Sequence, residues 1–248
     1  MIRKTQLALY VAEDTEKMAE QAAELIEAKS VEAIKERGIF NIALSGGSTP
    51  LPLFRLLSSS AWRKRINWDK TAIYWVDERC YGPDHEQSNY RRAKAELLSN
   101  ISSIKIYRMR GEEDPVKAAL DYENMLKEHF NCTGDEIPRF DCVILGVGED
   151  GHVASLYPNM PGLKIKNRLI VDQYVPSLHK ARLTMTLELL NNSRCCIFLA
   201  SGKKKYHVLE TALNLMKEPV LPAQMVRPYN GSLCWIIDEA AYRGEKSE

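Results

Sequence analysis

The feature that most constrains the fold of this 248-residue chain is the alternation of short apolar segments with longer amphipathic ones. This pattern predicts a mostly parallel sheet covered by helices. The expected strands are Leu7–Val11, Asn41–Leu44, Thr71–Val76, Ile104–Tyr107, Phe140–Leu145, Leu169–Asp172, Arg182–Thr186, Cys195–Leu199 and Ser232–Asp238. The expected helices are Thr15–Arg37, Thr49–Leu57, Asn89–Leu98, Pro115–Phe130 and Lys203–Met216. Because no repeat or linker interrupts the pattern, the sequence predicts a single α/β domain over residues 1–248.

Residues with strong conformational preferences mark several helix ends. Gly38 stands where the long first helix would need a left-handed C-cap. Thr49 and Pro50 are typical of an N-cap followed by the first helical position. Ser88 precedes the third expected helix in the same manner.

Composition excludes several classes of partner. With 45% hydrophobic and 27% charged residues, the composition is typical of a soluble globular protein. The net charge of +1 is too small to favour binding to nucleic acid. No apolar run is long enough to span a bilayer, and the amino terminus lacks the apolar core of a signal peptide. The six cysteines form no C-x-x-C pair and read as free thiols, so a cytoplasmic protein without a metal site is expected.

The glycine-rich run Gly146–His152 follows an apolar strand-like segment. Ligands of open α/β sheets bind beside the carboxyl ends of strands, so Asp150 and His152 are a candidate orienter and base. A turn that only satisfies backbone geometry remains the alternative.

The same run also fits the dinucleotide-binding pattern G-x-G-x-x-G, with Asp172 at a suitable distance. Two features disfavour this interpretation. Pro158 and Pro161 limit any following helix to about two turns, and the carboxylates of Glu149 and Asp150 would face the pyrophosphate.

Four further segments carry groups suited to an anion. The loop Ser45, Gly46, Gly47, Ser48, Thr49 joins a strand to a helix and predicts a phosphate pocket, although a plain tight turn fits as well. It lacks the Gly-Lys-Ser/Thr of a Walker A loop.

The cluster Asp77, Glu78, Arg79 follows another strand. Arg79 is a candidate to bind a phosphate or an oxyanion. The carboxylates of Asp77 and Glu78 are candidates to bind sugar hydroxyls or to orient Arg79. The alternative is that the three residues form a solvated loop without a ligand. Arg182 begins a predicted strand, and Lys205 lies in the first turn of a predicted helix. A lysine there interacts unfavourably with the helix dipole, and a bound anion would offset this interaction. Surface charge that serves only solubility explains both residues equally well.

Together these motifs resemble the family that contains 6-phosphogluconolactonases and glucosamine-6-phosphate deaminases, and the lactonases in particular. The resemblance covers nearly the full length. Its ordered motifs are Leu44–Pro50, Trp75–Arg79 with Ser88 and Asn89, Leu145–Pro158, Arg182–Thr186, Gly202–Lys205, Leu221–Ala223 and Trp235–Asp238. It implies a modified doubly wound, Rossmann-like fold with helices on both faces of the sheet. It also implies, without metal or cofactor, hydrolysis of 6-phospho-D-glucono-1,5-lactone to 6-phospho-D-gluconate in the oxidative pentose phosphate pathway.

The resemblance also implies roles for the residues. His152 would be the base and Asp150 its orienter. We further expect Arg79 to stabilise the oxyanion and the Ser45–Thr49 loop with Arg182 and Lys205 to hold the phosphate, but the sequence leaves the division of these two roles among Arg79, Arg182 and Lys205 open. Asp77, Glu78 and Gly151 are further candidates for substrate binding. The small departures from the family pattern touch loop shape. They are Tyr81–Gly82 for Val-Pro, His179–Ala181 where prolines are usual, and Val153 and Tyr157 for Thr and Phe.

Two alternatives remain open. A glucosamine-6-phosphate deaminase or isomerase is the nearest, but Ala154–Pro158 holds no carboxylate and Asp-Glu-Arg replaces the deaminase-like Asp-Glu-Tyr. A non-catalytic sugar-phosphate sensor is the other, although it has no need of the Asp150–His152 pair. The sequence leaves the oligomeric state, monomer or homodimer, undecided.

Overall fold

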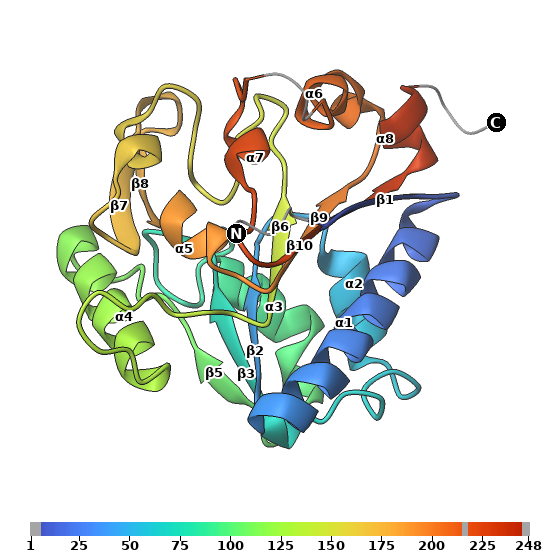
Figure 1. The fold of residues 1–248 in the computed structure, drawn as a ribbon, viewed down its shortest axis with the longest axis horizontal. Helices are drawn as coiled ribbons and strands as arrows, with labels where there is room; N and C mark the ends of the chain where they lie inside the picture. Colours follow the sequence, from blue (N-terminus) through green and yellow to red (C-terminus); the bar gives the residue numbers. More distant parts are fainter. Residues whose placement is uncertain (1–5, 215–217, 245–248) are drawn as a thin grey trace.

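The computed structural model describes residues 6–214 and 218–244, and the main sheet that they form has seven strands, all paired in parallel (Figure 1). In spatial order the strands are β1 (Gln6–Ala12), β10 (Ser232–Asp238), β9 (Cys195–Ala200), β6 (Cys142–Gly146), β2 (Phe40–Leu44), β3 (Thr71–Trp75) and β5 (Lys105–Tyr107). Parallel neighbours need crossover connections, and the intervening helices supply them. The predicted doubly wound α/β fold is confirmed.

Helices lie on both sides of this sheet (Figure 1). They are α1 (Thr15–Arg37), α2 (Leu51–Ser58), α3 (Asn89–Glu96), α4 (Pro115–His129), α5 (Leu187–Asn191), α6 (Tyr206–Ala212), α7 (Pro222–Met225) and α8 (Glu239–Arg243). In the view of Figure 1, α1 and α2 lie on one side of β2 and β3, and α4 lies on the other. The strands between them are therefore covered on both faces.

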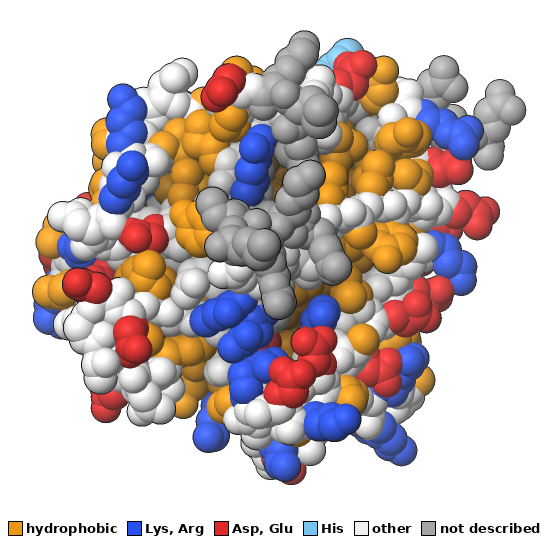
Figure 2. Space-filling model, viewed as in Figure 1, with side chains coloured by type: hydrophobic (Ala, Val, Ile, Leu, Met, Phe, Trp, Pro, Cys, Tyr) orange, Lys and Arg blue, Asp and Glu red, His pale blue; other side chains and the backbone are white. Residues whose placement is uncertain are grey.

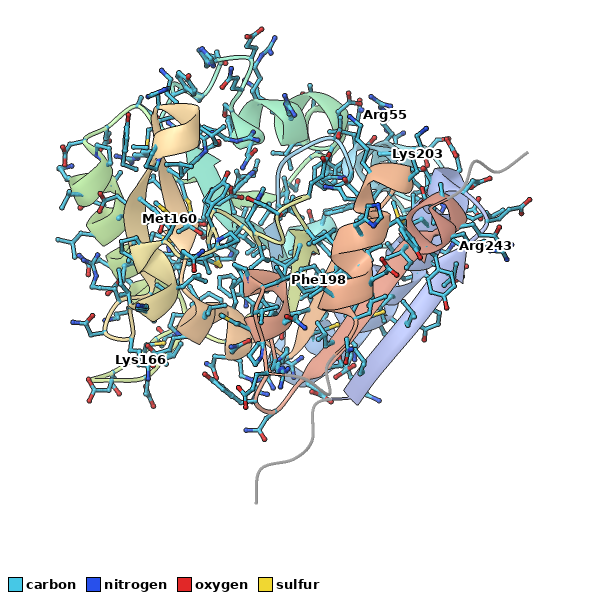
Figure 3. The ribbon with its side chains drawn as sticks, turned by 90° about the horizontal axis from the view of Figure 1, so that it is seen from above. Arg55, Met160, Lys166, Phe198, Lys203 and Arg243 are labelled. Atoms are coloured by element: carbon cyan, nitrogen blue, oxygen red, sulfur yellow. The ribbon has the colours of Figure 1, made fainter. Side chains whose placement is uncertain are left out.

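The central strands are apolar throughout because they are buried on both faces. Every residue of β3 and β9 is buried, and β6 is buried over its first four residues. Phe198 of β9 stacks on Trp235 of β10 with 4.0 Å between ring centroids. In Figure 3 Phe198 lies near the middle of the molecule, whereas Lys203 and Arg243 lie toward its periphery.

The helix ends follow the local signals only in part. Gly38 ends α1 in the left-handed conformation (φ 78°), and the Ser88 hydroxyl accepts from the Arg91 amide at the start of α3, as predicted. The Thr49 prediction is wrong: α2 begins at Leu51 after Pro50, without a side-chain cap. The expected helix Lys203–Met216 is a 3-10 turn, Lys203–Lys205, followed by α6, and Met216 lies outside the described residues.

A second, antiparallel sheet of three strands corrects one expectation. It consists of β4 (Asp77–Arg79), β8 (Lys180–Met185) and β7 (Ile170–Val175), so the last two do not join the main sheet. The 3-10 turn Pro176–Leu178 and the left-handed His179 (φ 48°) reverse the chain directly, which leaves no crossover for parallel pairing. The alternating burial at the end of β7 is typical of such a sheet with one solvated face.

Surface charge of both signs is distributed over the molecule. On the face shown in Figure 2, Lys and Arg side chains lie among Asp and Glu, in keeping with a net charge of +1. In the described parts of the chain, no helix combines the length and the apolar character that crossing a membrane requires.

Candidate active site

A cavity of about 530 Å³ lies at the carboxyl ends of the central strands. Its walls come from the loops after β2, β6 and β9 and from the start of β4. The neighbours β2 and β6 are the point where the chain order reverses, with β3 and β5 on one side and β9 and β10 on the other. Such a switch point is where open α/β sheets bind ligands. A groove between β5 and α4 is slightly larger, about 590 Å³, but none of the predicted site residues lines it.

The loop after β6 folds into a compact turn. The Gly148 amide donates to the His152 carbonyl (2.9 Å), and the Gly151 amide donates to the Gly148 carbonyl (3.0 Å). Gly151 has φ +82°, and a Cβ there would come within 2.7 Å of Leu221. Gly151 therefore shapes the turn against Leu221 and is not among the described residues that line the cavity.

The turn brings together the predicted base and its orienter. His152 Nδ1 lies 2.6 Å from Asp150 Oδ1, and the same oxygen accepts from the His152 amide (3.1 Å). A carboxylate on Nδ1 favours the tautomer in which Nε2 is the free proton acceptor. Gly148 permits this pair because a Cβ at that position would collide with the imidazole and lie 2.5 Å from Asp150 Oδ1.

Tyr157 covers one side of the imidazole. Its ring centroid lies 4.3 Å from that of His152, with 32° between the planes, and its side chain lines the cavity. Burial raises the pKa of the Tyr157 phenol, so the group is a hydrogen-bond donor throughout the neutral range.

The predicted phosphate loop forms another part of the wall, because Ser45, Gly46, Gly47, Ser48 and Thr49 all line the cavity. Gly46 is packed so closely on the Asn89 amide that any Cβ would overlap it. Gly47 has φ +88°, a conformation that glycine adopts without strain.

Lys205 adds a cation to this wall. Its Nζ donates to the Val147 carbonyl (2.7 Å), which ties the loop after β9 to the loop after β6. Burial lowers the pKa of Lys205, although Glu149 and Asp150 act in the opposite direction. A dianionic ligand in the cavity would favour the charged amine.

Arg79 lines the cavity and is held by α3. Its guanidinium donates to the Gln87 carbonyl (2.8 Å) and to the side-chain oxygen of Asn89. Arg182 lies directly opposite Arg79 in the β4–β8 pair, is mostly buried, and is not part of the described cavity wall. The positive charges of Arg79 and Arg182 repel each other at this position, and an anion bound nearby would reduce the repulsion.

The two carboxylates after β3 face different surroundings. Asp77 lines the cavity and is held by the Ser155 hydroxyl (2.8 Å) and the Asn89 amide group (3.3 Å). Glu78 turns away, is only 2% exposed, and accepts from Ser88 and from the amides at the start of α3. Burial raises the pKa of Glu78, although those amides lower it.

Among residues 6–214 and 218–244, no group of three or more His, Cys, Asp and Glu side chains is placed to hold a metal ion. The residues that line the cavity are the ones available for chemistry. They include an imidazole–carboxylate pair, two further carboxylates (Asp77 and Glu149), two cations and a glycine-rich loop.

Known proteins resemble this chain in sequence and in fold. The family model described as glucosamine-6-phosphate isomerases/6-phosphogluconolactonase matches residues 13–235. The chain belongs to this family. The match begins just before α1 and ends within β10, so it covers nearly all of the predicted motifs. The resemblance predicted from the motifs, and with it the expectation of an enzyme, is confirmed.

Curated relatives in the family are similar over most of their length. The 6-phosphogluconolactonase of Synechocystis sp. is 36% identical over 228 residues, which cover 90% of this chain and 92% of that one. The human 6-phosphogluconolactonase is 37% identical over 211 residues, 84% of this chain and 81% of that one. A solved structure of 6-phosphogluconolactonase from Leishmania guyanensis superposes with a TM-score of 0.81 at 26% identity, over 97% of this chain and 99% of that one.

The structure also brings residues to the site that the sequence did not single out for it. They are Asn89, Glu149, Tyr157 and Leu178, all of which line the cavity. Asn89 follows the capping Ser88, and Tyr157 lies five residues after His152, so the positions were visible but their orientation was not. No local pattern indicates Leu178, because it comes from the β7–β8 turn.

Proposed function

We propose that this chain hydrolyses 6-phospho-D-glucono-1,5-lactone to 6-phospho-D-gluconate in the oxidative pentose phosphate pathway, in the cytoplasm. The observation that carries the proposal is the 2.6 Å contact of His152 with Asp150 in a cavity that the Ser45–Thr49 loop and Lys205 also line. The curated relatives that bear the name of this activity support it.

The imidazole supplies the base. His152 Nε2 takes a proton from water as the water oxygen attacks the lactone carbonyl carbon. Asp150 holds the ring on its Nδ1 side and stabilises the positive charge that develops on it. The imidazolium then gives its proton to the ring oxygen as the C–O bond breaks, which leaves a carboxylic acid and a free hydroxyl.

Cationic side chains and the Ser45–Thr49 loop bind the substrate phosphate and stabilise the oxyanion. The amides and hydroxyls of the Ser45–Thr49 loop, with Lys205, hold the phosphate, and Arg79 stabilises the oxyanion of the tetrahedral intermediate. Arg182 acts on the same anions through its charge from the opposite strand. Anchoring the phosphate far from the reacting carbon fixes the lactone in place and lowers the entropic barrier.

Asp77 is the group best placed to accept hydrogen bonds from sugar hydroxyls, because Asn89 and Ser155 fix its carboxylate at the cavity wall. Glu78 and Gly151 act indirectly, since the first holds the start of α3 and the second shapes the turn that carries His152.

The test is a coupled assay in which glucose-6-phosphate dehydrogenase makes the lactone and its disappearance is followed at slightly acidic pH with EDTA present. We expect rapid decay with the unaltered protein. His152→Ala should reduce decay to the uncatalysed background, and Asp150→Asn should lower kcat by about three to four orders of magnitude. His207→Ala is the control, because that side chain is 90% exposed on α6.

Background decay with the unaltered protein would refute the proposal, and deamination of glucosamine-6-phosphate would then be measured. Full activity of His152→Ala would remove the imidazole from the role of base while leaving the lactonase activity in place.

A further inference from the structure

The Tyr157 side chain packs against the imidazole of His152 at the wall of the cavity. Its ring lies against His152, and its phenol is within reach of the charges of Arg182, Asp77, Asp150 and Arg79. The proposed chemistry uses those charged groups and the imidazole, but it does not use the phenol.

The Tyr157 phenol has no hydrogen-bond partner among residues 6–214 and 218–244. In the described parts of the chain, no residue forms a hydrogen bond with the Tyr157 hydroxyl, although the side chain is half-buried at the cavity wall. A half-buried hydroxyl without a protein partner loses part of its hydration, and a ligand oxygen in the cavity would restore the lost hydrogen bond. Tyrosine hydroxyls at ligand sites commonly have this role of fixing orientation.

Its position relative to His152 limits which part of the substrate it can reach. The imidazole must lie within hydrogen-bond distance of the water that attacks the carbonyl carbon. A phenol whose ring lies against that imidazole, with 4.3 Å between the ring centroids, is near the same end of the sugar. The proposed function assigns the phosphate, on C6, to the Ser45–Thr49 loop and Lys205, which also line the cavity. The substituent next to the carbonyl carbon is the hydroxyl on C2.

We propose that the Tyr157 hydroxyl donates a hydrogen bond to the C2 hydroxyl of the lactone, and that it thereby selects substrates that carry this hydroxyl. The inference rests on the proposed function. Because the hydrogen bond is present in the bound ground state as well as in the transition state, its loss affects KM more than kcat.

The experiment is a cycle with two proteins and two substrates. The unaltered chain and Tyr157→Phe are compared on 6-phosphogluconolactone and on its 2-deoxy analogue, each made in situ by glucose-6-phosphate dehydrogenase. Phenylalanine keeps the ring on His152 and removes only the hydroxyl. Tyr229→Phe is the matched control, because Tyr229 is exposed and lies outside the cavity.

On the natural lactone, Tyr157→Phe should lower kcat/KM by about three- to ten-fold, the value of one net hydrogen bond, with kcat nearly unchanged. On the 2-deoxy lactone the same substitution should change kcat/KM by less than about two-fold. Unchanged kinetics on the natural lactone, or equal losses on both substrates, would overturn the inference while the lactonase activity stands. Absence of lactone hydrolysis by the unaltered chain would overturn the proposed function and this inference together.

Discussion

Gly148→Ala tests whether the position of the imidazole, and not only its presence, determines activity. A Cβ at residue 148 would lie 2.5 Å from Asp150 Oδ1 and would collide with the His152 ring. Restoring an ordinary contact of 3.4 Å requires the carboxylate to move by 0.9 Å, and the ring must move further. A misplacement of about 1 Å in a catalytic group costs roughly 100-fold in rate, so kcat should fall by about two orders of magnitude.

The assay for this prediction has two readouts. Lactone hydrolysis gives kcat, and urea unfolding gives the free energy of unfolding, which should fall by no more than about 1–2 kcal/mol because the turn can adjust locally. Gly82→Ala is the control, since a Cβ there meets nothing within 4 Å and the residue has an ordinary backbone conformation. If Gly148→Ala and Gly82→Ala had the same kcat, the packing of Gly148 against the pair would not matter for catalysis.

Three further predictions concern the surroundings of the site. Because burial lowers the pKa of Lys205, the affinity for 6-phosphogluconate should decline at alkaline pH before free lysines lose their proton. Lys205→Arg should remove that decline in titration calorimetry, and an identical pH dependence would exclude this amine from the phosphate site. Glu78→Gln should lower the free energy of unfolding by about 1–3 kcal/mol in urea, because the amide presents donors to the N–H groups of α3. An unchanged midpoint would count against the capping role. Tyr122→Phe should cost a similar amount without altering kcat, since its buried hydroxyl bonds to β3 at Trp75; a kinetic effect would contradict the structural role.

Local sequence patterns predicted the strands of the main sheet, because the pattern that marks a strand is formed by residues that are neighbours along the chain. The β6 and β9 segments are apolar throughout, as strands covered on both faces must be, and Gly38 and Ser88 mark helix ends through their own backbone and side-chain preferences. The Thr49 cap was not predicted correctly, because α2 begins at Leu51, Pro50 is its N-cap residue, and no side chain caps the helix.

The pairing of Asp150 with His152 was predicted because one short segment carries both residues. Asp150 and His152 are two residues apart, so a single turn brings them within 2.6 Å. Glu78 shows the limit of this reasoning: it stands between two residues that line the cavity, yet strand alternation turns it to α3, where it caps the helix from inside the protein.

By itself, the sequence determined the strand and helix segments, the glycine turns and the pairing of His152 with Asp150, because each depends on residues that are neighbours along the chain. Only the tertiary structure decided that β7 and β8 form a separate sheet with β4, that Arg182 faces Arg79, and that Ser155 fixes Asp77 from 78 positions away. Contacts between distant segments depend on how the layers pack, and packing is a property of the whole chain that no local pattern contains.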